Sequence, residues 1–193
     1  MLTKSQIEHY REFGYLVVPG VLPRDLLASV RATVDKLIAA AANLHSHTDI
    51  YDLEDAHTPA APRVRRIKTP HRHFPFFAEL TRNPCITDIL AQILGSDIRL
   101  HGSKLNMKSA GYGAAVEWHQ DWAFYPHTND DVLRASILTT VAWRTGRCWS
   151  CQAAIGGGSS TTMQTVILPV PWTLSLRPLD MIEPYRWWVK LAQ

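Results

Sequence analysis

The chain has 193 residues and a formal net charge of +3, a length that suits one domain with a buried core. So small a charge does not indicate a nucleic-acid partner, and there is no apolar run of about eighteen residues that could span a membrane. The N-terminal residues lack the apolar core of a secretory signal, so we expect a cytoplasmic protein. Three cysteines, Cys85, Cys148 and Cys151, are too few for a disulfide framework.

The N-terminal part predicts two helices around a short strand. Residues 3–6 form a capping box, so a helix is expected from there to about Phe13, with Gly14 as its left-handed end. Residues 15–18 are predicted to form a buried strand. Apolar residues recur at helical spacing over residues 26–38, which predicts a longer amphipathic helix.

The next part combines a loop, a helix and a strand. Residues 44–66 are polar and contain His and Pro, and are predicted to form a loop over a site. Asn83 and Pro84 predict the start of a third helix, which Gly95 ends. Residues 98–107 alternate well enough to predict the first long strand of a sheet.

Candidate metal ligands lie at His119 and Asp121, which one residue separates. In an extended segment, residues two apart point to the same face, so an imidazole and a carboxylate can bind one metal ion. With a distant histidine they would form the facial triad of non-haem Fe(II) oxygenases, which leaves positions for oxygen and a 2-oxo acid. The alternative at this spacing is a hydrogen-bonded surface pair.

The other histidines near these positions have structural interpretations. His71 and His73 are expected in a loop, His101 on a strand, and His127 beside a turn. His127 is unsuited to be a third ligand, because the intervening turn would have to fold back onto the metal.

Residues 118–133 resemble the iron-binding segment of the phytanoyl-CoA dioxygenase family. The N-terminal helix, residues 13–18 and residues 105–108 also resemble it, so the resemblance covers residues 1–133. It implies a hydroxylase that uses Fe(II), with 2-oxoglutarate as co-substrate, on a small-molecule substrate. The implied fold is a double-stranded β-helix, a cupin-like jelly roll that is mainly β with N-terminal helices (α+β).

Carried over position by position, the resemblance implies particular site residues. His119 and Asp121 match the first two iron ligands, and Gln120 matches a position that contacts 2-oxoglutarate. Lys68 and Lys104 lie where the family often places co-substrate contacts. The alternatives are a solvated loop lysine for Lys68 and an outward-facing strand residue for Lys104.

Residues 134–193 depart from the family pattern. No histidine follows His127, and neither the distal iron ligand nor the segment with the 2-oxoglutarate-anchoring arginine is found. Residues 1–133 carry 14 basic and 15 acidic side chains, whereas residues 134–193 carry 6 and 2 and hold five of the seven tryptophans. We therefore predict that residues 1–133 supply the helices and early strands of a dioxygenase domain. Residues 134–193 are then an aberrant tail, and the jelly roll is incomplete at its C-terminus.

A lost nucleotide near codon 134 accounts for this change. Written TGC CAG GCA GCC ATC, the codons of residues 151–155 give Pro-Gly-Ser-His in the displaced frame, which resembles a family segment. Trp172 has a single codon, so residues 172–173 must give Asp in that frame. We interpret residues 134–193 as a frameshifted read-through and expect the chain as written to be inactive and to expose apolar core surface.

Two alternative interpretations assign the chain to classes of protein other than enzymes. The chain can be an iron-free binding module on a dioxygenase-derived scaffold, although prolines interrupt the periodicity that a selected tail should show. His119 and Asp121 could instead bind a structural zinc with Cys148 and Cys151. These cysteines also have redox C-x-x-C spacing, but without a thioredoxin-like strand and helix. The substrate and the oligomeric state do not follow from the sequence.

Overall fold

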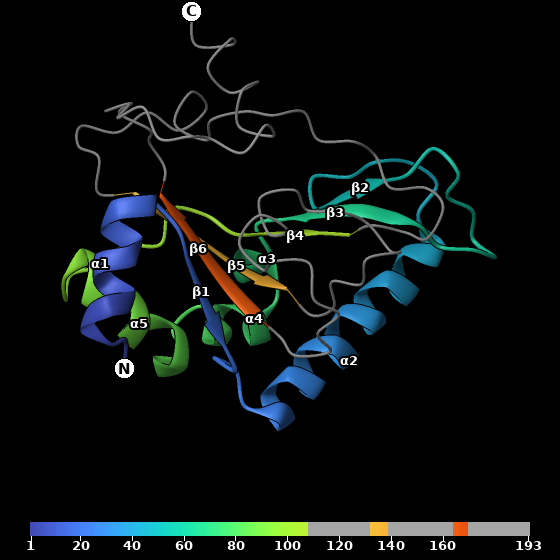
Figure 1. Ribbon diagram of the computed structural model, residues 1–193. Coiled ribbons are helices and arrows are strands. Elements are labelled where there is room, and N and C mark those ends of the chain that lie inside the picture. Colours follow the sequence, from blue (N-terminus) through green and yellow to red (C-terminus); the bar gives the residue numbers. More distant parts are fainter. Residues whose placement is uncertain (108–131, 139–163, 170–193) are drawn as a thin grey trace, which may run out of the picture.

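The computed structural model describes residues 1–107, 132–138 and 164–169, which form two small antiparallel sheets and a set of helices (Figure 1). The helices are α1 (Lys4–Phe13), α2 (Arg24–Ala40), α3 (Pro70–His73), α4 (Pro75–Leu80) and α5 (Pro84–Leu94), with a 3-10 turn η1 (Ala41–Asn43). The strands are β1 (Leu16–Pro19), β2 (Tyr51–Leu53), β3 (Val64–Lys68), β4 (Lys104–Asn106), β5 (Leu133–Leu138) and β6 (Gln164–Pro169). Helical residues outnumber strand residues in the described ranges.

Helix α1 begins and ends where the sequence predicts. Thr3 Oγ1 accepts a hydrogen bond from Gln6 N at 3.2 Å, and Thr3 N donates to Gln6 Oε1 at 2.9 Å, which completes the capping box. Gly14 adopts φ 75° and donates its N–H to Tyr10 O at 2.8 Å. The strand predicted to follow is β1, one residue later than expected.

Helix α2 joins two hydrophobic clusters. The buried residues of the first cluster are Leu22, Val30 and Ile86. Those of the second cluster are Ala41, Leu53, Val64 and Ile67. The first half of α2 supplies Val30 to the first cluster, and its last turns lie against the second. Full burial of a side chain such as Ile67 stabilises the fold by about 1.5–3 kcal/mol, so the second cluster holds the sheet β2–β3–β4 on α2.

The sheet β2–β3–β4 has two chemically different faces, because residues opposite each other on paired strands point to the same side. Tyr51 is opposite Ile67, and Ile67 is opposite Leu105, which makes one face apolar and part of the second cluster. The other face, here called the polar face, carries Asp52, Arg66, Lys68, Lys104 and Asn106. Helix α2 and the turn η1 thus cover the apolar side of the sheet, and the charged side chains lie on the other side.

Two predicted elements are wrong in their extent. The loop expected over residues 44–66 contains β2 and the first part of β3, and a register shift between Asp52 and Leu53 breaks the alternation that marks a strand. The strand expected over residues 98–107 is only three residues long, Lys104–Asn106. Leu100 is 46% exposed, so the alternation before β4 does not mark a buried face. His101 accordingly does not lie on a strand.

The second sheet joins distant parts of the chain, in the order β1-β6-β5. Leu16 of β1 is opposite Ile167 of β6, and Leu133 of β5 is opposite Pro169. Figure 1 shows these strands beside α1 and α5, with β6 between β1 and β5. The predicted boundary after residue 133 falls at the first residue of β5, and it stays a prediction.

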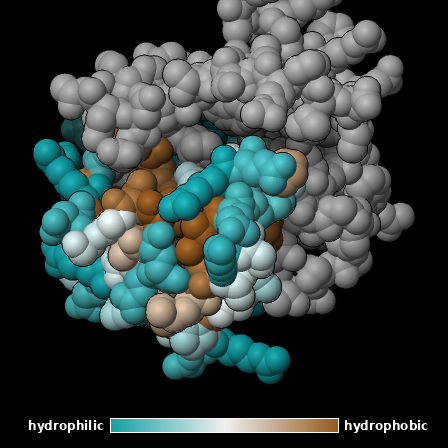
Figure 2. Space-filling model, turned by 60° about the vertical axis from the view of Figure 1, so that its left-hand side comes forward, coloured by the Kyte–Doolittle hydropathy of each residue, from teal (hydrophilic) through white to brown (hydrophobic). Residues whose placement is uncertain are grey.

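Apolar side chains reach the surface on the side of α1 and α5. Figure 2, which turns this side forward, shows apolar surface in the middle of the face with polar groups around it. Phe13, at the end of α1, is 43% exposed. Separately, the helices within the described ranges include none that is both long and apolar enough to cross a membrane.

Candidate functional site

The structure brings together two of the predicted site residues. Lys68 is the last residue of β3, Lys104 is the first of β4, and the two are directly opposite each other. The other predicted site residues lie outside the described part of the chain, and their arrangement stays a prediction: His119, Gln120, Asp121, His127, Cys148 and Cys151.

Lys68 and Lys104 form a close cross-strand pair, here called the lysine pair. The neighbouring opposite residues, Thr69 and Ser103, are joined by a backbone hydrogen bond from Thr69 N to Ser103 O at 3.0 Å. Hydrogen-bonded and non-hydrogen-bonded pairs alternate along an antiparallel ladder, so the lysine pair is of the second kind, with Cα atoms about 4.5 Å apart. Like charges directly opposite each other destabilise a strand pair, so other groups must offset this repulsion.

Asp52 and Thr48 hold the ammonium group of Lys68. Lys68 Nζ donates to Asp52 Oδ1 at 3.0 Å and to Thr48 O at 2.9 Å. Arg66 Nη1 lies 3.9 Å from Asp52 Oδ2, so one carboxylate serves two cations. Lys68 therefore does not lie in a loop, as its alternative interpretation expected, but on β3, where its side chain is 37% exposed and its ammonium group has two acceptors. Lys104 is exposed on β4.

The polar face has the chemistry to bind an anion. It carries three cationic side chains and one carboxylate. Within the described residues, Arg66 Nε is buried without a hydrogen-bond partner. A buried unpaired donor costs about 1–3 kcal/mol, and an oxygen of a carboxylate would remove that cost through a charge-assisted hydrogen bond. This donor and the lysine pair fit an anionic ligand such as 2-oxoglutarate.

The chain after Lys68 does not enter a loop, as was expected for His71 and His73. Both histidines lie in the short helix α3, which Thr69 precedes with φ 44° and ψ 48°. A residue before proline is normally extended, so the sequence gives no signal for this left-handed turn. The prediction for these two residues is wrong because the turn depends on contacts with distant parts of the chain.

His71 makes the side-chain contact that links α3 to the start of β4. Its Nδ1 shares a hydrogen bond with Ser103 Oγ. Burial lowers the pKa of His71, and the charges of Arg72 and His73 lower it further. The imidazole is therefore neutral at neutral pH, so one of its ring nitrogens can accept the Ser103 hydroxyl proton.

The donor chemistry for iron comes from the sequence alone. The described residues contain no group of three or more His, Cys, Asp or Glu side chains that could hold a metal ion. His119 and Asp121 provide an imidazole nitrogen and a carboxylate oxygen, donors that suit Fe(II) as two of the three ligands of a facial triad.

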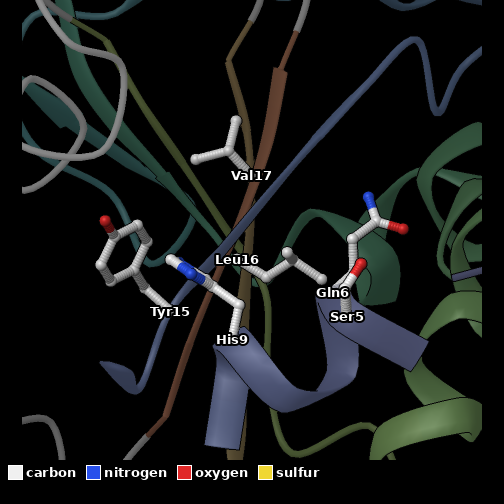
Figure 3. Close-up of a pocket in the computed structure, with 6 residues that line it drawn as sticks. All are labelled: Ser5, Gln6, His9, Tyr15, Leu16 and Val17. Atoms are coloured by element: carbon white, nitrogen blue, oxygen red, sulfur yellow. The ribbon is translucent and has the colours of Figure 1, made fainter. Parts of the chain in front are cut away.

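A shallow hollow between α1 and β1 is a different feature. Its volume is about 380 Å³, and it is lined by Ser5, Gln6, His9, Tyr15, Leu16 and Val17. Figure 3 shows His9 pointing from α1 toward Tyr15, and the two rings meet edge to face at 5.1 Å. It contains no predicted site residue, so we do not assign the candidate site to it.

Comparison with known proteins decides the family. Residues 10–145 match the phytanoyl-CoA dioxygenase (PhyH) family. The chain belongs to this family. The matched range includes His119, Gln120 and Asp121 and continues past the predicted boundary at residue 133. The resemblance inferred from residues 1–133 is therefore confirmed.

Similar proteins include several dioxygenases. The chain is 37% identical over 134 residues to a Stutzerimonas stutzeri protein named "Probable alpha-ketoglutarate-dependent hypophosphite dioxygenase". This alignment covers 69% of this chain and 46% of that protein. It is 29% identical over 130 residues to the ectoine dioxygenase of Streptomyces avermitilis, covering 67% of this chain and 41% of that protein. The chain thus spans less than half the length of these relatives.

Solved structures show the same fold. EctD from S. alaskensis with bound Fe matches with a TM-score of 0.68 and 18% identity, over 88% of this chain and 68% of that one. The same protein with 2-oxoglutarate and 5-hydroxyectoine gives a TM-score of 0.65. The likeness places the chain in the fold class of these cupin-like jelly-roll neighbours. The described residues themselves form two three-stranded antiparallel sheets and contain more helix than strand, so the mainly-β character that was predicted is not seen in them. The prediction of iron and 2-oxoglutarate agrees with the contents of these two structures and with the name of the hypophosphite relative.

Proposed function

We propose that this chain derives from an Fe(II)- and 2-oxoglutarate-dependent dioxygenase that oxidises a small molecule. The observation that carries this proposal is the family match over residues 10–145, which contains the His119 and Asp121 pair. His119 and Asp121 would hold Fe(II), and Gln120 would contact 2-oxoglutarate. When bound, the iron supplies the coupling of 2-oxoglutarate decarboxylation and oxygen reduction to substrate oxidation.

The polar face would bind the anionic groups of this reaction. The lysine pair concentrates positive charge, Asp52 orients Lys68, and Arg66 Nε offers a buried donor. The same chemistry suits a carboxylate of 2-oxoglutarate and a small oxoanion substrate. Because the hypophosphite relative is the more similar of the two described above, we propose a small oxoanion such as hypophosphite as the substrate class.

The 193 residues by themselves would lack activity. They contain no histidine after His127 and so supply only two of the three expected protein ligands, which would hold iron weakly. We attribute this to a frameshift near codon 134, since the displaced frame over residues 151–155 permits Pro-Gly-Ser-His, a segment of the family pattern. The restored frame should continue past this segment to a distal histidine. On this account residues 134–193 have no selected role, and the jelly roll is complete only in the restored frame.

Resequencing the gene from codon 120 onward tests the frameshift. A restored nucleotide near codon 134, with an open frame through Pro-Gly-Ser-His, is the expected result. An unchanged sequence whose displaced frame shows no such continuation would rule the frameshift out, and the tail would be real.

Turnover by the restored protein tests the activity. With Fe(II) it should decarboxylate 2-oxoglutarate, faster with hypophosphite than with ectoine or L-proline, and His119→Ala should abolish the reaction. The 193-residue chain serves as the matched inactive control. A restored protein that binds Fe(II) but decarboxylates no 2-oxoglutarate, with or without these compounds, would contradict the proposed activity.

One observation favours the iron-free binding module as a second candidate. Strand β6 lies within the predicted tail, yet it pairs with both β1 and β5. Val166 is opposite Val17 on one side and Ser136 on the other. If this sheet was selected, Val166→Pro in a central strand should lower the free energy of unfolding by about 3 kcal/mol or more. An unchanged denaturation midpoint would count against the module.

A further inference from the structure

The turn between β3 and α3 holds a residue in an unfavourable backbone conformation. Thr69 is the one non-glycine residue with positive φ among the described residues, at φ 44° and ψ 48°. This region is rarely populated by β-branched side chains and persists only where the surroundings enforce it. Such residues gather at functional sites, so the turn next to the lysine pair calls for an explanation.

Backbone contacts on three sides hold this turn. Thr69 N donates to Ser103 O at 3.0 Å, Arg72 N donates to Thr69 O at 2.9 Å, and Lys68 N donates to Ile50 O at 2.8 Å. The turn is thus tied to β4, to α3 and to the segment before β2.

A side-chain hydrogen bond adds a second contact to Ser103. His71 Nδ1 shares a hydrogen bond with Ser103 Oγ, across 32 residues of sequence. Ser103 is therefore held twice, by its carbonyl oxygen and by its hydroxyl group. The residues that make these contacts are the direct neighbours of the lysine pair, because Thr69 follows Lys68 and Ser103 precedes Lys104.

The lysine pair needs such support. Two like charges in a close cross-strand position push the strand ends apart, and β3 and β4 both end at this point. The strand ends would separate most readily there, where the sheet pairing stops. A link across the end of the ladder keeps both ammonium groups on one side of the sheet and at short separation.

We propose that Thr69, His71 and Ser103 form a clamp whose role is to hold Lys68 and Lys104 together as a preorganised anion-binding pair. These three are positioning residues, since they act through the lysine pair. The proposal rests on the proposed function, in which the polar face binds 2-oxoglutarate or a small oxoanion. An anion then meets two cations already in place, and less freedom is lost on binding.

Variants of the 193-residue chain test the clamp. Ser103→Ala and His71→Phe remove the side-chain link, and His71→Asn keeps a polar atom near the position of Nδ1. Ser29→Ala is the matched control, because it also removes a hydroxyl-to-protein hydrogen bond, to Asp25 O at 3.0 Å on α2. We expect faster backbone amide exchange at residues 104–106 in Ser103→Ala and His71→Phe. Exchange there should be unchanged in His71→Asn and Ser29→Ala.

Affinity for 2-oxoglutarate, measured by titration calorimetry, should fall about three- to ten-fold in Ser103→Ala and His71→Phe. His71→Asn should restore most of it. Thr69→Gly tests the backbone part of the clamp: glycine keeps the N–H that donates to Ser103 O and adopts this backbone without strain, so neither affinity nor melting temperature should fall. If affinity in Thr69→Gly falls as far as in Ser103→Ala, the backbone link from Thr69 to Ser103 does not hold the lysine pair and the clamp is wrong.

Two outcomes distinguish failure of the clamp from failure of the proposed function. Unchanged exchange at residues 104–106 in both Ser103→Ala and His71→Phe overturns the clamp, whatever the ligand. Lys68→Met and Lys104→Met test the anion site directly. If neither weakens binding of 2-oxoglutarate or hypophosphite, the anion site is wrong, and the clamp joins two strands without serving a ligand.

Discussion

The sheets β2–β3–β4 and β1–β6–β5 differ in how far apart their paired strands lie along the chain. The first uses residues 51–106, and its apolar face packs into a cluster completed by α2 and η1. The second pairs residues 16–19 with residues 164–169, so its formation closes a much longer loop. The first sheet is therefore completed within residues 51–106, whereas the second depends on residues beyond the predicted boundary.

This difference separates the parts of the candidate site. The lysine pair lies on the first sheet, whose three strands all precede residue 133. The predicted iron ligands, His119 and Asp121, lie in sequence between β4 of the first sheet and β5 of the second. We infer that anion binding can survive in a chain whose iron site is incomplete, which makes the two activities separable by experiment.

The largest expected change in the free energy of unfolding comes from truncating a buried isoleucine, and one isoleucine from each sheet allows the comparison. Ile67 is 0% exposed at the centre of the second cluster, whereas Ile137 of β5 is partly buried against the first cluster. Ile67→Ala should lower the free energy of unfolding by about 2–5 kcal/mol, and Ile137→Ala by about half of that or less. Urea denaturation followed by circular dichroism measures both. Equal losses would show that the second sheet is as well packed as the first.

The sequence predicts the helices better than the strands, and the reason is the range of the signals. The capping box at residues 3–6 involves only residues at the start of α1, and Asn83 and Gly95 involve only the two ends of α5. All three signals mark helix ends where the sequence predicts them. Strands β2 and β3 were missed because a register shift hides their alternation, and the segment that joins them is polar. Strand β4 is short because its partner β3 ends at Lys68.

The candidate site was predicted only in part, for a similar reason. The resemblance indicated Lys68 and Lys104, but only strand pairing shows that they face each other. The roles of Thr69 and Ser103 were not predicted, because they depend on a contact between residues far apart in sequence. Arg66 could have been singled out as a cation two positions before Lys68, which shares a face with it on any strand.

A smaller effect compares the caps of two helices. Asn83 Oδ1 accepts a hydrogen bond from Cys85 N at 2.9 Å at the start of α5, which supplies Ile86 to the first cluster. Helix α1, capped by Thr3, has no buried residue. Asn83→Ala should therefore lower the free energy of unfolding by about 1 kcal/mol. Thr3→Ala should chiefly increase amide exchange within α1, and an equal global loss would mean that α1 is integral to the core.

A still smaller effect concerns the charges of the polar face. Asp52→Asn keeps an oxygen near Lys68 Nζ but removes the charge, and both side chains are partly exposed, at 24% and 37%. The expected loss of unfolding free energy is about 1 kcal/mol or less and should shrink at high salt. Glu8→Gln is the control, since its ion pair with Lys4 at 3.7 Å is far more exposed and should contribute nothing measurable. A loss that does not depend on salt would contradict the account in which the charge of Asp52 stabilises the polar face.

The smallest effect is the pH dependence that His71 gives to the end of the first sheet. Burial, with the nearby charges of Arg72 and His73, lowers the pKa of His71 below its ordinary value of 6.5. Just below that pH the unfolded chain binds more protons than the folded one, so the free energy of unfolding should fall as the pH falls through this range and stay level above it.

His71→Gln should reduce this acid-side loss, measured as the difference in melting temperature between about pH 5 and about pH 8. In the unmodified chain, the protection of the amides of residues 104–106, corrected for the pH dependence of intrinsic exchange, should fall as the pH falls through this range, because a protonated imidazole no longer accepts the Ser103 hydroxyl proton. In the second sheet, exchange in β1 should not follow the titration. If β1 and β4 respond alike, protonation of His71 loosens the whole fold, and the link between His71 and Ser103 does not act locally on the lysine pair.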